Sequence, residues 1–183
     1  GAPPTIPRFD RRFFDAGERF TVIGGGSVGG KAAGLLRSQR ILAEAFPEGE
    51  ACGFQVDIPF LTVISTELFD AFMERNGLWE AGLSDESDTF IANAFQKASL
   101  PTELLGDLRA IIEQVRQPLA VRSSSLLEDA LYRPFAGVYE TKMIPNNQLD
   151  ADTRFHKLVE AVKFVYASMF FKGARSYIKA AER

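Results

Sequence analysis

The sequence has little of what marks several large classes of protein. It contains one cysteine, Cys52, so an internal disulfide framework is excluded, and this composition fits a reducing cytoplasm. No apolar run is long enough to cross a bilayer, and the N-terminus has no apolar signal core, so we expect no membrane partner. The net charge is −3 with no basic block, which argues against nucleic acid as a partner. The one histidine, His156, follows Phe155 in a predicted amphipathic helix, so we interpret it as a helix residue and not as a phosphate carrier.

What is present indicates one globular domain of mixed α and β structure. The chain has 183 residues, of which 46% are apolar and 25% are charged. Residues 1–19 are expected to form an arm or linker, and 20–183 the domain itself, which we expect to be truncated at its C-terminus. Short apolar runs predict strands, and apolar stripes at helical spacing predict helices. The predicted strands are 20–23, 56–64, 119–122 and 136–144. Two helices are predicted to begin after Lys31 and after Thr66, and a third to include Phe90 to Phe95. A fourth helix is predicted over 101–117, and one unbroken helix is predicted from Thr153 to Ala181.

A glycine-rich loop, GGGSVGGKAAG, follows the first predicted strand. Glycines between a strand and a helix expose several backbone N–H groups, which together with a lysine suit a phosphate. Three interpretations stay open from the loop alone. The stretch from Gly25 to Lys31 fits a P-loop, but Ala32 replaces the hydroxyl residue that would hold magnesium. Gly24, Gly26 and Gly29 fit the weak dinucleotide fingerprint, and a flexible turn with a solvated lysine is the third possibility.

An arginine followed by three serines comes directly after the third predicted strand. The guanidinium of Arg122 can bind two oxygens of a phosphate or carboxylate at once. Glu128 and Asp129 can orient this arginine, bind a cation or start a turn, whereas a strand end with a surface salt bridge explains the stretch without a ligand. Thr141 lies in the next predicted strand and offers a hydroxyl.

Together these stretches resemble the N-terminal nucleotide-binding domain of the pyruvate phosphate dikinase and phosphoenolpyruvate synthase family. The family's GGK-x-A-x-L loop matches 29–35, its strand and helix with N-G-L match 58–78, and its V-R-S-S-x-x-x-E-D matches 121–129. Its S-F-A-G-x-x-[DE]-T matches 134–141, and its helix with A-S-x-x-x-x-R-A-x-x-Y resembles 167–177. Each motif alone is modest, but five in the right order make a specific resemblance.

The resemblance implies an ATP-grasp-like domain of which this chain is the N-terminal part, with a sheet flanked by helices. It implies that Lys31 and Arg122 contact the phosphates of ATP and act in catalysis. It extends ATP binding to a set of neighbouring positions: Gly29, Gly30, Ser123, Glu128, Asp129, Gly137 and Thr141. No residue of this chain is expected to bind a metal, because the family's Mg²⁺ ligands and its adenine-binding strand come after the matched region.

The function implied is that of the ATP-binding portion of a multidomain phosphotransferase. Such a parent passes a phosphoryl group from ATP, through a histidine on another domain, to pyruvate or a related acceptor. Its partners are therefore ATP, the downstream domains and a pyruvate-like molecule, and we expect the fragment alone to be inactive. Departures from the family pattern at 59–61 and 126–134 keep an alternative open, in which an inactive dikinase-like module serves docking or regulation.

Overall fold

A computed structural model of the chain describes residues 6–12, 19–25, 50–51, 54–55, 60–123 and 141–181. Its strands are β1 Phe20–Ile23, β2 Glu50–Ala51, β3 Phe54–Gln55, β4 Leu61–Ile64, β5 Leu119–Arg122 and β6 Thr141–Ile144. Its helices are α3 Thr66–Arg75, α4 Leu78–Leu83, α5 Asp88–Lys97, α6 Thr102–Gln114, α8 Ala151–Ser168 and α9 Lys172–Ala181. The mixture of helices with small sheets agrees with the predicted α+β class. No helix among the described residues is long and apolar enough to span a bilayer.

The first pair of strands is parallel. Phe20 of β1 pairs with Leu61 of β4, and Ile23 pairs with Ile64, so the two strands end side by side. The hydroxyls of Thr21 and Thr62 lie 3.1 Å apart across this pair. Both strands were predicted, β4 as the end of 56–64, of which 56–59 lie outside the described residues. The carboxyl ends of β1 and β4 therefore share one edge of the sheet.

The N-terminal arm lies along the other side of β1. The N–H of Phe9 donates to the carbonyl of Val22 at 2.8 Å, and the N–H of Val22 donates to the carbonyl of Pro7 at 3.0 Å. Arg11 then reaches α6, where its Nε lies 3.1 Å from a carboxylate oxygen of Asp107. Residues 6–12 thus cover an edge of β1 that would otherwise expose unpaired backbone groups.

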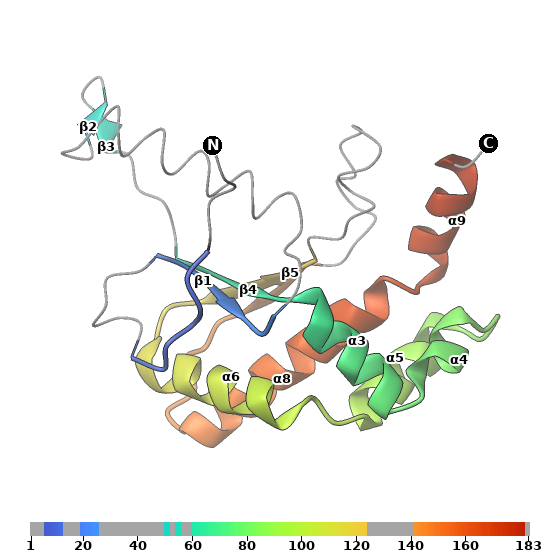
Figure 1. Cartoon of the computed structure of the whole chain (residues 1–183), viewed down its shortest axis with the longest axis horizontal. Helices are drawn as coiled ribbons and strands as arrows, with labels where there is room; N and C mark the ends of the chain where they lie inside the picture. The colour runs from blue at the N-terminus through green and yellow to red at the C-terminus, as the bar shows by residue number, and fades with distance from the viewer. Residues whose placement is uncertain are drawn as a thin grey trace.

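The second pair of strands, β5 and β6, is antiparallel. Leu119 pairs with Ile144 at one end and Arg122 pairs with Thr141 at the other. Ile144 belongs to the apolar core, and Leu119 and Val121 pack against it. Helix α8 packs on both strands and also on α5 and α6. Figure 1 shows α6 and α8 together on one side of the strands. One face of β5–β6 is therefore buried, and on the other face Ala120, Arg122, Thr141 and Met143 are exposed.

Helices α3, α5 and α6 form where the apolar stripes predicted them, whereas the helix predicted after Lys31 lies outside the described residues. In α6 the stripe buries Leu104, Leu108, Ile111 and Ile112, and the helix ends at Gln114, three residues before the predicted end at 117. Ser87 caps α5, since its Oγ accepts from the N–H of Phe90, and Asp150 caps α8 in the same way. The core that results joins residues from α3, α5, α6 and α8: Leu68, Phe72, Met73, Ile91, Phe95, Leu104, Leu108, Ile112, Leu158 and Val162.

The prediction of one unbroken helix from Thr153 to Ala181 is wrong. The helix stops at Ser168, whose Oγ donates back to the carbonyl of Val165 at 2.6 Å, and a second helix, α9, begins at Lys172. Asp88 of α5 caps α9 by accepting from the N–H of Lys172 at 2.9 Å. The break lets Phe170 turn into the core, where its ring stacks near Phe69 and Phe95. Helical periodicity continues through such a break because a tight turn keeps nearly the same spacing.

The short helix α4 was not predicted. Asn76-Gly77 is typical of a helix C-terminus, and α3 does end at Arg75. Gly77 has a φ of +60°, which glycine adopts without strain, and it also begins α4. At the end of α4, Gly82 packs so closely under Phe170 that a Cβ there would lie 2.9 Å from the ring.

Candidate functional site on the outer face of β5 and β6

Two of the predicted ligand residues meet in the antiparallel pair β5–β6. Arg122 and Thr141 are directly opposite each other in the register, and both are exposed. Residues opposite each other in an antiparallel pair point to the same face, with Cβ atoms about 4.5–5.5 Å apart. The guanidinium and the hydroxyl therefore start from neighbouring positions on one accessible surface. Such a pair offers several hydrogen-bond donors to one anion.

The next pair on that face is apolar. Ala120 lies opposite Met143, and both are exposed, with 62% of Met143 open to solvent. Leu119, Val121 and Ile144 alternate with these residues and point toward the core. We call the four exposed residues Ala120, Arg122, Thr141 and Met143 the outer face.

Ser123 and Lys142 lie next to the outer face but are not part of it. Ser123, another predicted ligand, directly follows β5 and is half-buried. Lys142 lies opposite Val121, and its Nζ lies 4.8 Å from the centre of the Phe164 ring of α8. Lys142 therefore adds a positive charge close to Arg122, but it points to the opposite side of the strand pair.

The structure describes the start of the glycine-rich loop. Gly24 follows β1 with a φ of +86°, and a Cβ on it would lie 2.5 Å from the Oγ of Ser65 and 2.8 Å from Leu68. A Cβ on Gly25 would collide with the carboxylate of Glu67. Gly24 is thus needed where the chain passes over the N-terminus of α3, whereas the exposed side chain of Glu67 can move away from a Cβ on Gly25. The Oγ of Ser65 is buried and has no hydrogen-bond partner within the described part of the chain.

The remaining predicted ligands lie outside the described residues. These are Gly29, Gly30, Lys31, Glu128, Asp129 and Gly137. Their assignments stay predictions, and so do the departures at 126–134. Among the residues that the structure does describe, no three His, Cys, Asp or Glu side chains gather as metal ligands.

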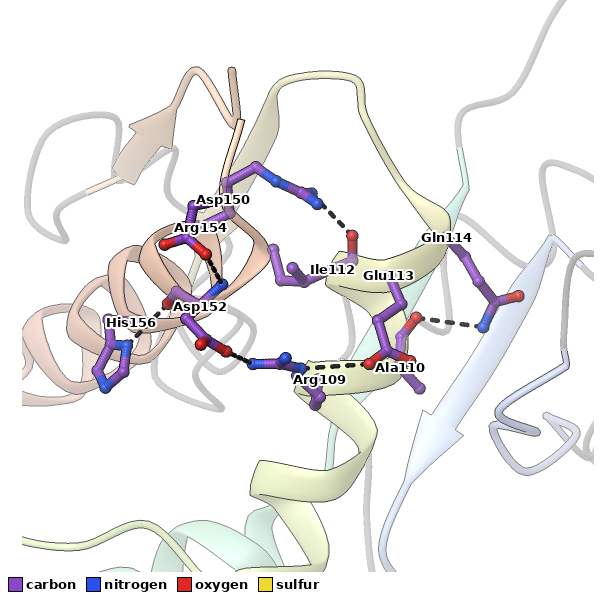
Figure 2. Close-up of polar contacts among 9 residues, drawn as sticks. All are labelled: Arg109, Ala110, Ile112, Glu113, Gln114, Asp150, Asp152, Arg154 and His156. Atoms are coloured by element: carbon purple, nitrogen blue, oxygen red, sulfur yellow. Dashed lines mark hydrogen bonds and ion pairs between the residues drawn. The ribbon is translucent and has the colours of Figure 1, made fainter. Parts of the chain in front are cut away.

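His156 lies in a helix, as predicted. In α8 its Nδ1 lies 2.7 Å from the carbonyl oxygen of Asp152, one turn earlier (Figure 2). An Nδ1–H that donates to this carbonyl holds the ring against its own helix.

Comparison with known families decides where the chain belongs. The family model described as pyruvate phosphate dikinase, AMP/ATP-binding domain, matches residues 25–182. The chain belongs to this family. No curated protein and no solved structure matches it closely enough to be compared. The matched region includes β5, β6 and the whole outer face, and it begins at Gly25 of the glycine-rich loop.

Several residues of the last family motif pack within the fold. Ala167, Ser168 and Ala174 are buried, so small side chains there let α8 and α9 meet the rest of the core. Arg175 donates from one guanidinium nitrogen to the carbonyls of Gly82 and Ser84, at the end of α4. Sequence reasoning had no signal for this role, since the carbonyls belong to a helix that it missed.

Proposed function

We propose that this domain is the ATP-binding portion of a multidomain, dikinase-type phosphotransferase, and that it forms the N-terminal part of an ATP-grasp-like fold. Family membership supports a kinase-family parent and an adenine nucleotide as the ligand. The observation that carries the proposal is the direct pairing of Arg122 with Thr141 on an accessible face.

Phosphoryl transfer needs positioning and charge neutralisation more than it needs covalent chemistry from side chains. Arg122 supplies a permanent positive charge with donors arranged to bind two phosphate oxygens, and Thr141 supplies a hydroxyl beside it. In the proposal, Lys31 and the backbone N–H groups of the glycine-rich loop bind the polyphosphate from a second side. The close fit of Gly24 and Gly25 over α3 supports this loop position, because it anchors the loop where β1 and β4 end.

The phosphate assignment is tested by ATP titration of three variants. Arg122→Ala and Lys31→Ala should each lower the affinity for ATP by about tenfold or more, as expected for loss of a charge-assisted hydrogen bond. Lys142→Ala is the matched control, because it removes a positive charge next to Thr141 but on the opposite side of the strands. Equal affinities in wild type, Arg122→Ala and Lys31→Ala would refute the assignment. Equal losses in all three variants would indicate a general effect of charge.

For the parent protein we propose transfer of the phosphoryl group through a histidine on another domain to pyruvate or a related acceptor, with Mg²⁺ held by residues outside this chain. The test is incubation of the full-length protein with ATP and Mg²⁺, followed by detection of acid-labile phosphohistidine and of acceptor-dependent turnover. A parent that binds ATP but forms no phosphohistidine would refute this reaction and would favour a docking or regulatory module.

A further inference from the structure

Helix α4 exposes two large apolar side chains to solvent. Trp79 and Leu83 are four residues apart, so they lie next to each other on one side of the helix, and they are 39% and 65% exposed. The opposite side of α4 is buried through Leu78 and Gly82. The helix packs against α5, at the end of the domain away from α6 (Figure 1). The core thus uses one side of α4 and leaves an accessible apolar pair on the other.

The indole of Trp79 is held in place although it is partly exposed. Its ring centre lies 6.0 Å from that of Phe69 and 6.0 Å from that of Phe170, and both contacts are edge-to-face. An aromatic side chain that is already fixed loses little conformational entropy when a partner covers it. Tryptophan is also enriched among the residues that dominate the binding energy of interfaces. Trp79 therefore has the properties of an interface anchor.

The surroundings of the apolar pair are acidic. Residues 66–90 include seven acidic residues and one basic residue. Glu80 is exposed on α4, and the exposed Asp85 and Glu86 closely follow the helix. Arg175 lies 3.4 Å from a carboxylate oxygen of Asp85, but the side chain of Asp85 stays fully open to solvent. We call the following five residues the α4 surface: Trp79, Glu80, Leu83, Asp85 and Glu86.

The charge of the α4 surface decides which kind of partner fits it. In a two-fold contact between two copies of the chain, the surface would meet itself, and acidic side chains would face acidic side chains. Nucleic acids and anionic membranes are repelled for the same reason. A helix with basic residues beside an apolar stripe complements both the charge and the apolar pair, and such helices dock through side chains at i, i+3, i+4 and i+7.

We propose that the α4 surface docks a basic, amphipathic helix of a partner protein. Trp79 and Leu83 contact the apolar stripe of that helix, and the carboxylates of Glu80, Asp85 and Glu86 face its lysines or arginines. Charges at the rim of a contact act mainly on the rate of association and on the choice of partner, so the apolar pair carries most of the affinity. The α4 surface shares no residue with the outer face, and its variants should leave ATP binding unchanged.

The fluorescence of Trp79 reports directly on this surface, because it is the only tryptophan of the chain. The probe is a synthetic amphipathic helix of about 18 leucine and lysine residues, or about five turns. Added to the 183-residue chain, it should shift the emission to shorter wavelength with a micromolar Kd that weakens as salt is raised. The same peptide with glutamate in place of lysine should cause no shift. No shift with the lysine peptide, or an equal shift with the glutamate peptide, would overturn the proposal.

Variants separate docking on α4 from a general attraction between a basic peptide and an acidic chain. Leu83→Ser and Glu80→Lys should each weaken binding of the lysine peptide about 3- to 10-fold. Their matched controls are Leu149→Ser, at a leucine that is 95% exposed before α8, and Glu113→Lys at the end of α6, and both should retain the affinity. Equal losses in variant and control would overturn the site. A shift that grows with protein concentration in the absence of peptide would also overturn it, in favour of self-association.

Discussion

Arg109 of α6 and Arg154 of α8 each connect these two helices. A count of ion pairs suggests that Arg109 contributes more to stability, whereas the burial of the two side chains predicts that Arg154 does. Arg154 of α8 is only 2% exposed and has no acidic partner among the described residues. Arg109 of α6 is half-buried and reaches two exposed carboxylates, those of Asp152 and Glu113. Figure 2 shows both, with Arg154 directed at the carbonyl of Ile112 and Arg109 directed at Asp152.

The contribution of Arg154 can be worked from its contacts. One guanidinium nitrogen donates to the carbonyl of Ile112 at 2.8 Å and to the carbonyl of Val115 and the side-chain oxygen of Asn146, both at 3.3 Å. Ile112 lies in the last turn of α6, so its carbonyl has no partner within the helix, and a cation there also favours the helix dipole.

Replacing Arg154 by methionine keeps much of the apolar stem but leaves the Ile112 carbonyl buried and unpaired. That loss costs about 1–3 kcal/mol, and the lost charge–dipole attraction adds to it. Part of this loss is offset, because the substitution also removes a buried charge whose Nε has no hydrogen-bond acceptor among the described residues. We expect a net loss of about 2 kcal/mol in the free energy of unfolding, or about 4–8 °C in Tm for a chain of this size.

Urea and thermal unfolding of Arg154→Met and Arg109→Met provide the assay. Arg109→Met should lower Tm by a small fraction of the Arg154→Met shift, because exposed ion pairs contribute little and are screened by salt. The carboxylate of Asp152, and then that of Glu113, raises the pKa of Arg109, so its charge is present at every pH of the assay. If Arg109→Met is as destabilising as Arg154→Met, the reasoning from burial is wrong.

Three further variants test other parts of the fold. Gly24→Ala should destabilise the protein by about 2 kcal/mol or more, because Gly24 has a positive φ and its new Cβ would collide with Ser65 and Leu68. The control Gly173→Ala should be neutral or stabilising, because a Cβ there meets no other atom. Equal unfolding midpoints for the two variants would contradict this reasoning. Asp88→Ala should speed hydrogen exchange at the N–H of Lys172, and Asp88→Asn should restore protection, unless this cap is unimportant for α9. The hydroxyl of Tyr166 is buried and has no hydrogen-bond partner among the residues that the structure describes, and burial raises the pKa of Tyr166 above its usual 10. The unfolded tyrosine therefore loses its proton first, so wild-type stability should fall above pH 10, and Tyr166→Phe should fall less steeply in urea titrations at pH 9 and pH 11.

The sequence predicted those elements whose residues repeat at the spacing of their structure. The stripe of α6 and the apolar run of β5 are local signals, and both elements lie where these signals indicated. The end of α8 is not local in this sense. It depends on Phe170 packing against Gly82 and on Asp88 capping the next helix, and both partners are distant in sequence. A break fixed by such contacts leaves the helical periodicity intact, and so periodicity alone predicted one helix.

The family motifs are also local signals, and the role of each motif residue depends on contacts with residues that are distant in the sequence. The resemblance assigned Arg122 and Thr141 to ATP binding, and it matched the motif around Arg175 without giving that arginine a role. The structure distinguishes these roles. Arg122 and Thr141 pair on an exposed face, whereas Arg175 donates hydrogen bonds to the carbonyls at the end of α4. A motif position can thus match a family for packing or for binding, and the two causes differ in where the side chain points. Among the motif residues that the structure describes, Arg122 and Thr141 have exposed side chains on the outer face, and for that reason their variants, and not those of Arg175, test the proposed function.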